Sequence, residues 1–112
     1  MRCCFLLQVR PERLEDYKRE HQAVWPEMLT ALRDSGWRNY SIFARDDGLL
    51  VGYLEAEDFD AAQKAMAKTD ANARWQAHMG SYFIDIPGQL PSQPLVLLEE
   101  VFNLEDQLQR LG

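Results

Sequence analysis

The order of hydrophobic patterns along this chain constrains its fold more than any other feature of the sequence. Compact apolar segments typical of buried strands alternate with segments whose apolar residues recur every three or four positions, as in helices packed on a sheet. Two strand-like segments are consecutive, because residues 46–48 (DDG) between them form a turn signal. We expect strands at 2–9, 37–44, 49–56 and 94–104, and helices over about 11–35, 59–67 and 70–82.

This β-α-β-β-α-β order predicts an α+β protein with the ferredoxin-like fold, in which helices cover one face of a four-stranded antiparallel sheet. The chain of 112 residues fits a single domain, 1–112. The segment 86–94 is rich in Pro and Gly, so we expect an irregular loop there. The last residues, 104–111 (LEDQLQRL), could form a short terminal helix.

The strand sequences indicate that a second copy of the chain covers the other face of the sheet. In 49–54 and 95–98, residues on both alternating faces are apolar, whereas a strand with one covered face usually alternates with polar residues. Helices from one chain cover one face only, and a large apolar patch is unfavourable in water. We therefore predict a symmetric homodimer with the two sheets packed face to face, a dimeric α+β barrel.

Charge and hydropathy limit the partners and the location of the protein. The net charge of −6 at pH 7 disfavours nucleic acid and anionic membranes as partners, because both would repel the chain. No apolar run approaches the ~20 residues that span a bilayer, and the first residues do not form a secretion signal. Adjacent Cys3 and Cys4 point to opposite faces of a strand, so we expect them to be reduced. These features predict a soluble, cytoplasmic protein.

A tyrosine and a histidine stand one helical turn apart in the first helical segment. Tyr17 and His21 are spaced i, i+4, so their side chains are neighbours on the apolar face of that helix. An imidazole on this face is a candidate proton donor and acceptor near neutral pH, although a packed core histidine fits the spacing too. Pro26 predicts that the helix kinks or restarts just after His21, either opening a space or only separating two helices.

Other aromatic residues could form the wall of such a space. Tyr40 on the second strand and Trp75 on the last long helix are candidates, and ordinary core packing is the alternative for each. The sequence has only two histidines and no histidine, cysteine and carboxylate set with metal-ligand spacing. It also lacks a glycine-rich phosphate loop and a G-x-S-x-G motif. An enzyme of this composition is expected to transfer protons without a metal or other cofactor.

At these residues the chain resembles the L-rhamnose mutarotase family. Several motifs carry the resemblance: Y-x3-H-x3-WPE at 17–27, NYSIF at 39–43, LL-x-G-Y at 49–53, TD…RW at 69–75 and EEVF at 99–102. The resemblance implies a homodimeric barrel that interconverts the α and β anomers of a 6-deoxyhexose. It implies His21 as the catalytic proton donor, and Tyr17, Tyr40 and Trp75 as sugar-binding residues.

The chain departs from the family pattern at two places. Where the family has Arg-Trp-Trp, this chain has Arg74-Trp75-Gln76, so we place Gln76 at the substrate in the position of the second tryptophan. His78 stands nearby, and the loop 87–94 (PGQLPSQP) also differs from the family. These changes bear on which sugar is bound. NYSIF and the following GY also resemble a close branch of the family associated with L-fucose, so L-fucose is an alternative sugar. A cofactor-free monooxygenase of the same barrel architecture and a non-catalytic ligand-binding barrel are the rival functions.

Overall fold

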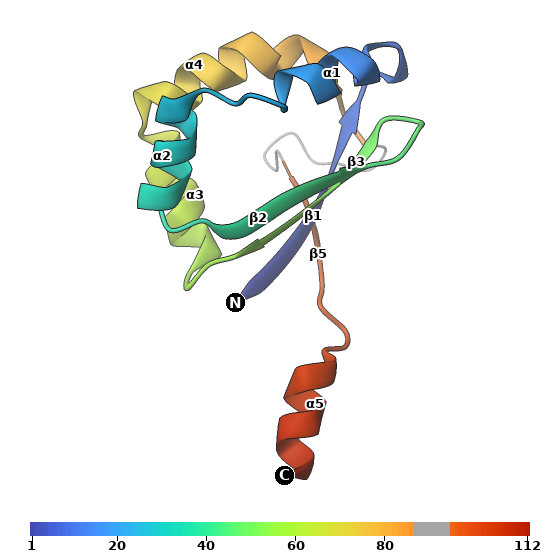
Figure 1. Ribbon diagram of the computed structural model, residues 1–112, viewed down its shortest axis with the longest axis vertical. Coiled ribbons are helices and arrows are strands. Elements are labelled where there is room, and N and C mark those ends of the chain that lie inside the picture. Colours follow the sequence, from blue (N-terminus) through green and yellow to red (C-terminus); the bar gives the residue numbers. More distant parts are fainter. Residues whose placement is uncertain (87–94) are drawn as a thin grey trace.

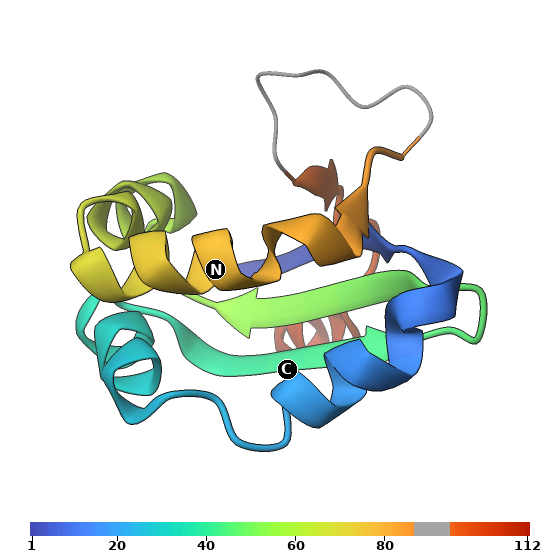
Figure 2. The same ribbon diagram turned by 90° about the horizontal axis from the view of Figure 1, so that it is seen from above.

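The computed structural model describes residues 1–86 and 95–112 and contains one antiparallel sheet with helices on one of its faces (Figures 1 and 2). The strand order is β2–β3–β1, and β4 and β5 both pair with the remaining edge of β1. The expected α+β class and antiparallel sheet are confirmed. The strands are β1 (Arg2–Val9), β2 (Arg38–Ala44), β3 (Leu49–Glu55), β4 (Phe83–Ile84) and β5 (Val96–Leu98).

The fourth strand position differs from the prediction, because two short strands share it. Phe83 and Ile84 of β4 pair with Val9 and Gln8, and β5 continues in the same direction opposite residues 4–6 of β1. The sheet therefore has five strands, and the expected strand at 94–104 is reduced to 96–98. The loop expected at 86–94 lies, except for residue 86, outside the described residues.

Four helices cover the inner face of the sheet, and a fifth stands apart from it (Figure 1). Three of these five helices have a side chain at the N-terminal end that accepts a hydrogen bond from a backbone N–H group. The capping residues are Asp58, Thr69 and Asn103. The expected terminal helix at 104–111 is confirmed. The helices are α1 (Leu14–Glu20), α2 (Pro26–Asp34), α3 (Phe59–Ala67), α4 (Asp70–Met79) and α5 (Leu104–Leu111), with 3₁₀ turns at Pro11–Arg13 and Gly80–Tyr82.

The first helical segment is divided where Pro26 predicted a break. His21 ends α1, and Pro26 occupies the first turn of α2. Trp25 adopts an extended backbone (φ −53°, ψ 134°), because the ring of the following proline disfavours helical torsions there. The helix expected over 70–82 also ends early, at Met79, and continues as the 3₁₀ turn. These breaks allow short helices to follow the curvature of the sheet.

The inner face of the sheet is tightly packed at one crossing point. Gly52 on β3 pairs with Phe5 on β1, and a Cβ atom at Gly52 would overlap the Phe5 ring. The ring of Phe5 thus lies flat across the neighbouring strand, in a space that only glycine leaves open. From there it reaches toward Tyr40, with 6.1 Å between the ring centroids. This crossing point forms part of the floor of the cavity described below.

The outer face of the sheet carries apolar side chains that none of the helices covers. By strand register, Phe43, Val51, Leu6 and Val96 form one row across four strands. Phe43 is 63% exposed, at one end of this row. Helix α5 projects from this outer side, away from the other helices (Figures 1 and 2). Within the described residues, no helix is both long enough and apolar enough to cross a bilayer.

Candidate active site

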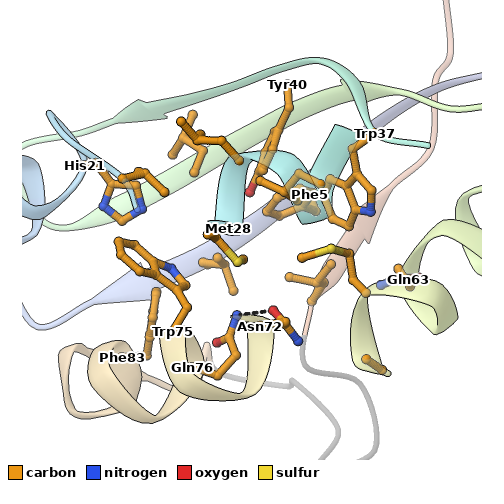
Figure 3. Close-up of a pocket in the computed structure, with 18 of the residues that line it drawn as sticks. Phe5, His21, Met28, Trp37, Tyr40, Gln63, Asn72, Trp75, Gln76 and Phe83 are labelled. Carbon is orange, nitrogen blue, oxygen red and sulfur yellow. Dashed lines mark hydrogen bonds between the residues drawn. The ribbon is translucent and has the colours of Figure 1, made fainter. Parts of the chain in front are cut away.

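A cavity of about 830 Å³ lies between the inner face of the sheet and the helices. This volume is within the usual range of small-molecule sites, roughly 300–1,000 Å³. Its floor comes from β1 and β2 and its walls from α1, α2, α3 and α4 (Figure 3). All five residues singled out from the sequence line this one cavity: Tyr17, His21, Tyr40, Trp75 and Gln76.

His21 is held by the residue one turn before it. Its ring stacks on the ring of Tyr17, with 4.1 Å between centroids. Its Nδ1 lies 3.1 Å from the carbonyl oxygen of Tyr17, which also accepts the backbone N–H of His21. A carbonyl only accepts, so Nδ1 must carry the proton in this bond. In the neutral ring Nε2 is then the unprotonated nitrogen, and among the described residues it has no hydrogen-bond partner.

The environment of His21 favours the neutral imidazole. Burial lowers the pKa of His21 below its ordinary value of 6.5, because the imidazolium form loses hydration. The Tyr17 carbonyl and the charge of Glu20 oppose this shift, and burial is the larger effect. The ring therefore combines a proton-accepting Nε2 with a pKa low enough to remain neutral at pH 7. A neutral ring of this kind can accept a proton at Nε2 and return it.

Trp75 lines the cavity beside His21 and packs against Trp25 as well. Its indole meets the His21 ring edge-on at 5.5 Å and the Trp25 ring edge-on at 4.9 Å. Trp75 is buried, so its orientation is fixed by packing. Trp25 was not predicted as part of the site. Its position follows from the extended backbone before Pro26, which turns the side chain toward α4.

His78, which follows Gln76 by two residues in the sequence, is not among the residues that line the cavity. Its Nε2 lies 2.9 Å from Glu20 Oε2, and its ring packs against Trp25 at 5.4 Å. The side chain is exposed, in contrast to the buried Met79 and Tyr82. His78 therefore links α4 to the end of α1, next to His21. The sequence could not reveal this contact, which depends on how two helices cross.

Two tyrosine hydroxyls belong to the cavity wall and remain protonated. Burial raises the pKa of both Tyr17 and Tyr40 well above the ordinary value of 10, and for Tyr17 the proximity of Tyr40 adds to the shift. Neither phenol can serve as a base near neutral pH. Both can donate and accept hydrogen bonds, as the sugar-binding role predicted for them requires.

Polar side chains from α3 and α4 also line the cavity, beside the aromatic residues. Gln76 Nε2 donates a 3.3 Å hydrogen bond to Asn72 Oδ1, one turn earlier on the helix (Figure 3). Gln63 also lines the cavity, from α3 (Figure 3). Sequence reasoning found Gln76 but missed Asn72 and Gln63. The i, i+4 spacing of Asn72 and Gln76 was the available signal for the first of these.

Comparison with known proteins identifies the family. The model of the family described as L-rhamnose mutarotase matches residues 2–104. This chain belongs to the L-rhamnose mutarotase family. A protein named L-rhamnose mutarotase from Pectobacterium atrosepticum is 36% identical over 106 residues, covering 94% of this chain and 99% of that protein. One of the same name from Oceanobacillus iheyensis is 38% identical over 76 residues, covering 67% and 72% of the two chains.

Solved structures confirm the fold of this family member. The crystal structure of L-rhamnose mutarotase FA22100 from Formosa agariphila superposes with a TM-score of 0.74 at 24% identity, over 93% of this chain and 98% of that chain. A putative antibiotic biosynthesis monooxygenase from Nitrosomonas europaea superposes with a TM-score of 0.59 at 13% identity, over 90% and 89%. At such identities the likeness concerns the fold alone. The monooxygenase-like structures therefore give no support to the rival oxygenase function.

Proposed function

We propose that this protein is an isomerase that interconverts the α and β anomers of L-rhamnose. Membership of the mutarotase family supports this function, and the single structural observation that carries it is the position of His21. This ring lines the cavity with Nδ1 held by a backbone carbonyl and Nε2 available for proton transfer. The chemistry needs one group that accepts and returns a proton, and a neutral imidazole does both.

In the proposed mechanism, His21 Nε2 first accepts the proton of the anomeric hydroxyl. The bond between C1 and the ring oxygen breaks, the electron pair moves to the ring oxygen, and C1 becomes an aldehyde. The proton then passes from Nε2 to the ring oxygen, directly or through water. Rotation about the C1–C2 bond presents the other face of the carbonyl, and the reverse steps close the ring as the other anomer. General acid–base catalysis of this kind contributes roughly 10²–10⁴-fold.

Binding of the sugar is divided between polar groups and an apolar surface of the cavity. Tyr17 and Tyr40 orient sugar hydroxyls through their protonated phenols, and Gln76 contributes an amide from α4. Trp75 packs against the apolar face that carries the 6-methyl group. This division suits a deoxyhexose, which has hydroxyls around the ring and one apolar corner.

Saturation-transfer NMR of anomer exchange tests the proposed function. Catalytic amounts of the protein should speed exchange between the anomers of L-rhamnose above the uncatalysed rate. The same assay with L-fucose tests whether Gln76, which replaces the second tryptophan of the family pattern, changes the preferred sugar. If it does, fucose exchange should be accelerated more than rhamnose exchange. If raising the protein concentration leaves the exchange rates of both sugars at their uncatalysed values, the proposal is refuted.

We also propose that the protein acts as a homodimer through the outer face of its sheet. The row formed by Phe43, Val51, Leu6 and Val96 spans four strands, and Leu98 beside it is 45% exposed. Monomeric proteins rarely leave a contiguous apolar surface of this extent in water. A second copy of the same sheet, packed face to face, covers it with a complementary surface because the interface of a twofold dimer is self-complementary.

A further inference from the structure

Helix α5 carries an apolar face that the described part of its own chain leaves exposed. Leu104, Leu108 and Leu111 are spaced i, i+4 and i+7, so they lie on one side of the helix. They are 54%, 48% and 85% exposed, respectively. Polar residues occupy the opposite side. The match to the family model ends at residue 104, where α5 begins.

The helix is too short to be stable without a packing partner. It has eight residues, whereas isolated helices need roughly 12–15 residues to be even marginally stable in water. Its first turn is capped by Asn103, which accepts the N–H of Asp106. A cap alone does not replace packing, so the stability of α5 has to come from burial of its leucine face.

An ion-pair cluster fixes the direction in which the helix leaves the domain. Arg2 on β1 donates to Glu100 at 2.8 Å and to Asp106 at 2.6 Å. These contacts join the start of the helix to the end of the sheet and point it outward. The longest dimension of the molecule, 48 Å, ends at α5, which extends beyond the outer face of the sheet (Figure 1).

From this geometry we infer that α5 is an arm that docks on the partner subunit of the homodimer, burying Leu104, Leu108 and Leu111 there. The inference rests on the proposed homodimer. The partner domain sits on the outer face, which is the side into which α5 projects. Leu98 on the sheet and Phe102 in the segment that leads to α5 are exposed too, at 45% and 61%, so exposed apolar residues follow the chain from the outer face to the leucine face. Each arm would thus extend the interface beyond the two sheets.

A lipid surface fits this helix less well than a second copy of the chain. Helices that lie on membranes are rich in Lys and Arg on their polar face. Helix α5 has Glu105 and Asp106 in its first turn and Arg110 as its basic residue. In a chain of net charge −6 this arrangement opposes binding to anionic lipids.

The test compares two serine substitutions at neighbouring positions of the full-length chain. Leu108→Ser removes the centre of the leucine face, and Gln109→Ser makes a similar loss of helix propensity on the polar face. Burial of one leucine is worth more than about tenfold in an equilibrium constant, and each substitution occurs twice in the dimer. Leu108→Ser should therefore weaken dimerisation about 100-fold or more in sedimentation equilibrium, and Gln109→Ser should leave it unchanged.

Isotope-filtered NOE spectra of mixed labelled and unlabelled protein identify the surface that the arm contacts. Intermolecular NOEs to the methyl groups of Leu108 and Leu111 are expected. If the wild-type protein is a dimer and Leu108→Ser dimerises with the same affinity, the proposed docking of α5 is wrong. It is also wrong if these methyl groups show NOEs only within one chain. Neither result contradicts the homodimer itself. A wild-type protein that is monomeric at all concentrations overturns both. Mutarotase activity is measured separately and decides neither.

Discussion

His21 stacks on Tyr17 at a centroid distance of 4.1 Å, and Tyr17 also holds the His21 ring through its own backbone carbonyl. One residue thus fixes both the plane of the imidazole and the nitrogen that carries its proton. The arrangement is local, because the two residues are one helical turn apart. The cavity that makes it useful is not local, since its other walls come from β2 and α4.

Replacement of His21 should remove most of the catalytic effect. His21→Ala and His21→Gln should each lower the enzymatic exchange rate by roughly 10²–10⁴-fold, because the proton-transferring group is lost. The glutamine keeps a polar side chain of similar reach, so it separates proton transfer from packing. Gln22→Ala, at the exposed neighbouring position, is the control and should retain the wild-type rate. Anomer exchange by NMR is the measurement, and wild-type activity in His21→Gln would exclude the imidazole from the mechanism.

The pH dependence should report the lowered pKa of His21. The neutral ring is the active base, and burial keeps it neutral to a pH below the ordinary 6.5. The exchange rate above background should therefore decline as the pH is lowered, with its midpoint below pH 6.5. A ¹³C-labelled histidine NMR titration gives the same pKa independently. A decline with its midpoint above pH 6.5 would contradict the buried, neutral ring.

Gln76→Ala should weaken sugar binding more than it slows the reaction. Loss of one hydrogen bond to a neutral group is worth about 0.5–1.5 kcal/mol, so KM should rise by about 2- to 10-fold while kcat changes less. Asn72, which accepts a hydrogen bond from Gln76, would also lose its partner. Gln107→Ala on α5 provides a remote control with the same chemical change. Equal loss in kcat and kcat/KM would instead place Gln76 at the transition state.

Gly52→Ala should destabilise the fold and disturb the floor of the cavity. The added methyl group would overlap the buried ring of Phe5, which is 1% exposed and has little room to move. Overpacking of this kind costs about 1–3 kcal/mol in the free energy of unfolding. Gly80→Ala is the matched control, because its Cβ would meet open space and its backbone is helical (φ −57°, ψ −35°). Urea unfolding of the two variants measures the difference, and equal stabilities would contradict the close approach of β1 and β3.

Val51→Asp should convert the proposed dimer into a monomer. Val51 lies in the middle of the apolar row on the outer face, so the twofold symmetry would place two buried carboxylates in the interface. Thr30→Asp adds the same charge at an exposed position of α2 and should leave the oligomeric state unchanged. Sedimentation velocity distinguishes the two species, with circular dichroism to verify that both variants are folded. A dimeric Val51→Asp protein would move the interface away from this face.

Local chemistry accounts for the parts of the fold that the sequence predicted well. The break before Pro26 and the turn at 46–48 depend on residues within one or two turns of the chain. The Asp58 and Thr69 caps found in the structure are equally local. The fourth strand was predicted less well. Its residues satisfy strand propensity over a longer range than the 96–98 that pair with β1, and pairing depends on where the rest of the sheet lies. The extra strand at Phe83–Ile84 forms for the same reason, because the edge of β1 is open beside it.

The sequence by itself determined the α+β order, the one-turn spacing of Tyr17 and His21, and the motifs of the mutarotase family. These features depend on hydrophobic periodicity and on the spacing of residues close together in the sequence, so they can be read without knowing the fold. Only the tertiary structure decided that Tyr40, Trp75 and Gln76 share one cavity with His21, that His78 points out of it toward Glu20, and that α5 leaves the domain with its leucines exposed. Each of these depends on the packing of segments distant in sequence, where burial and contact are properties of the assembled fold.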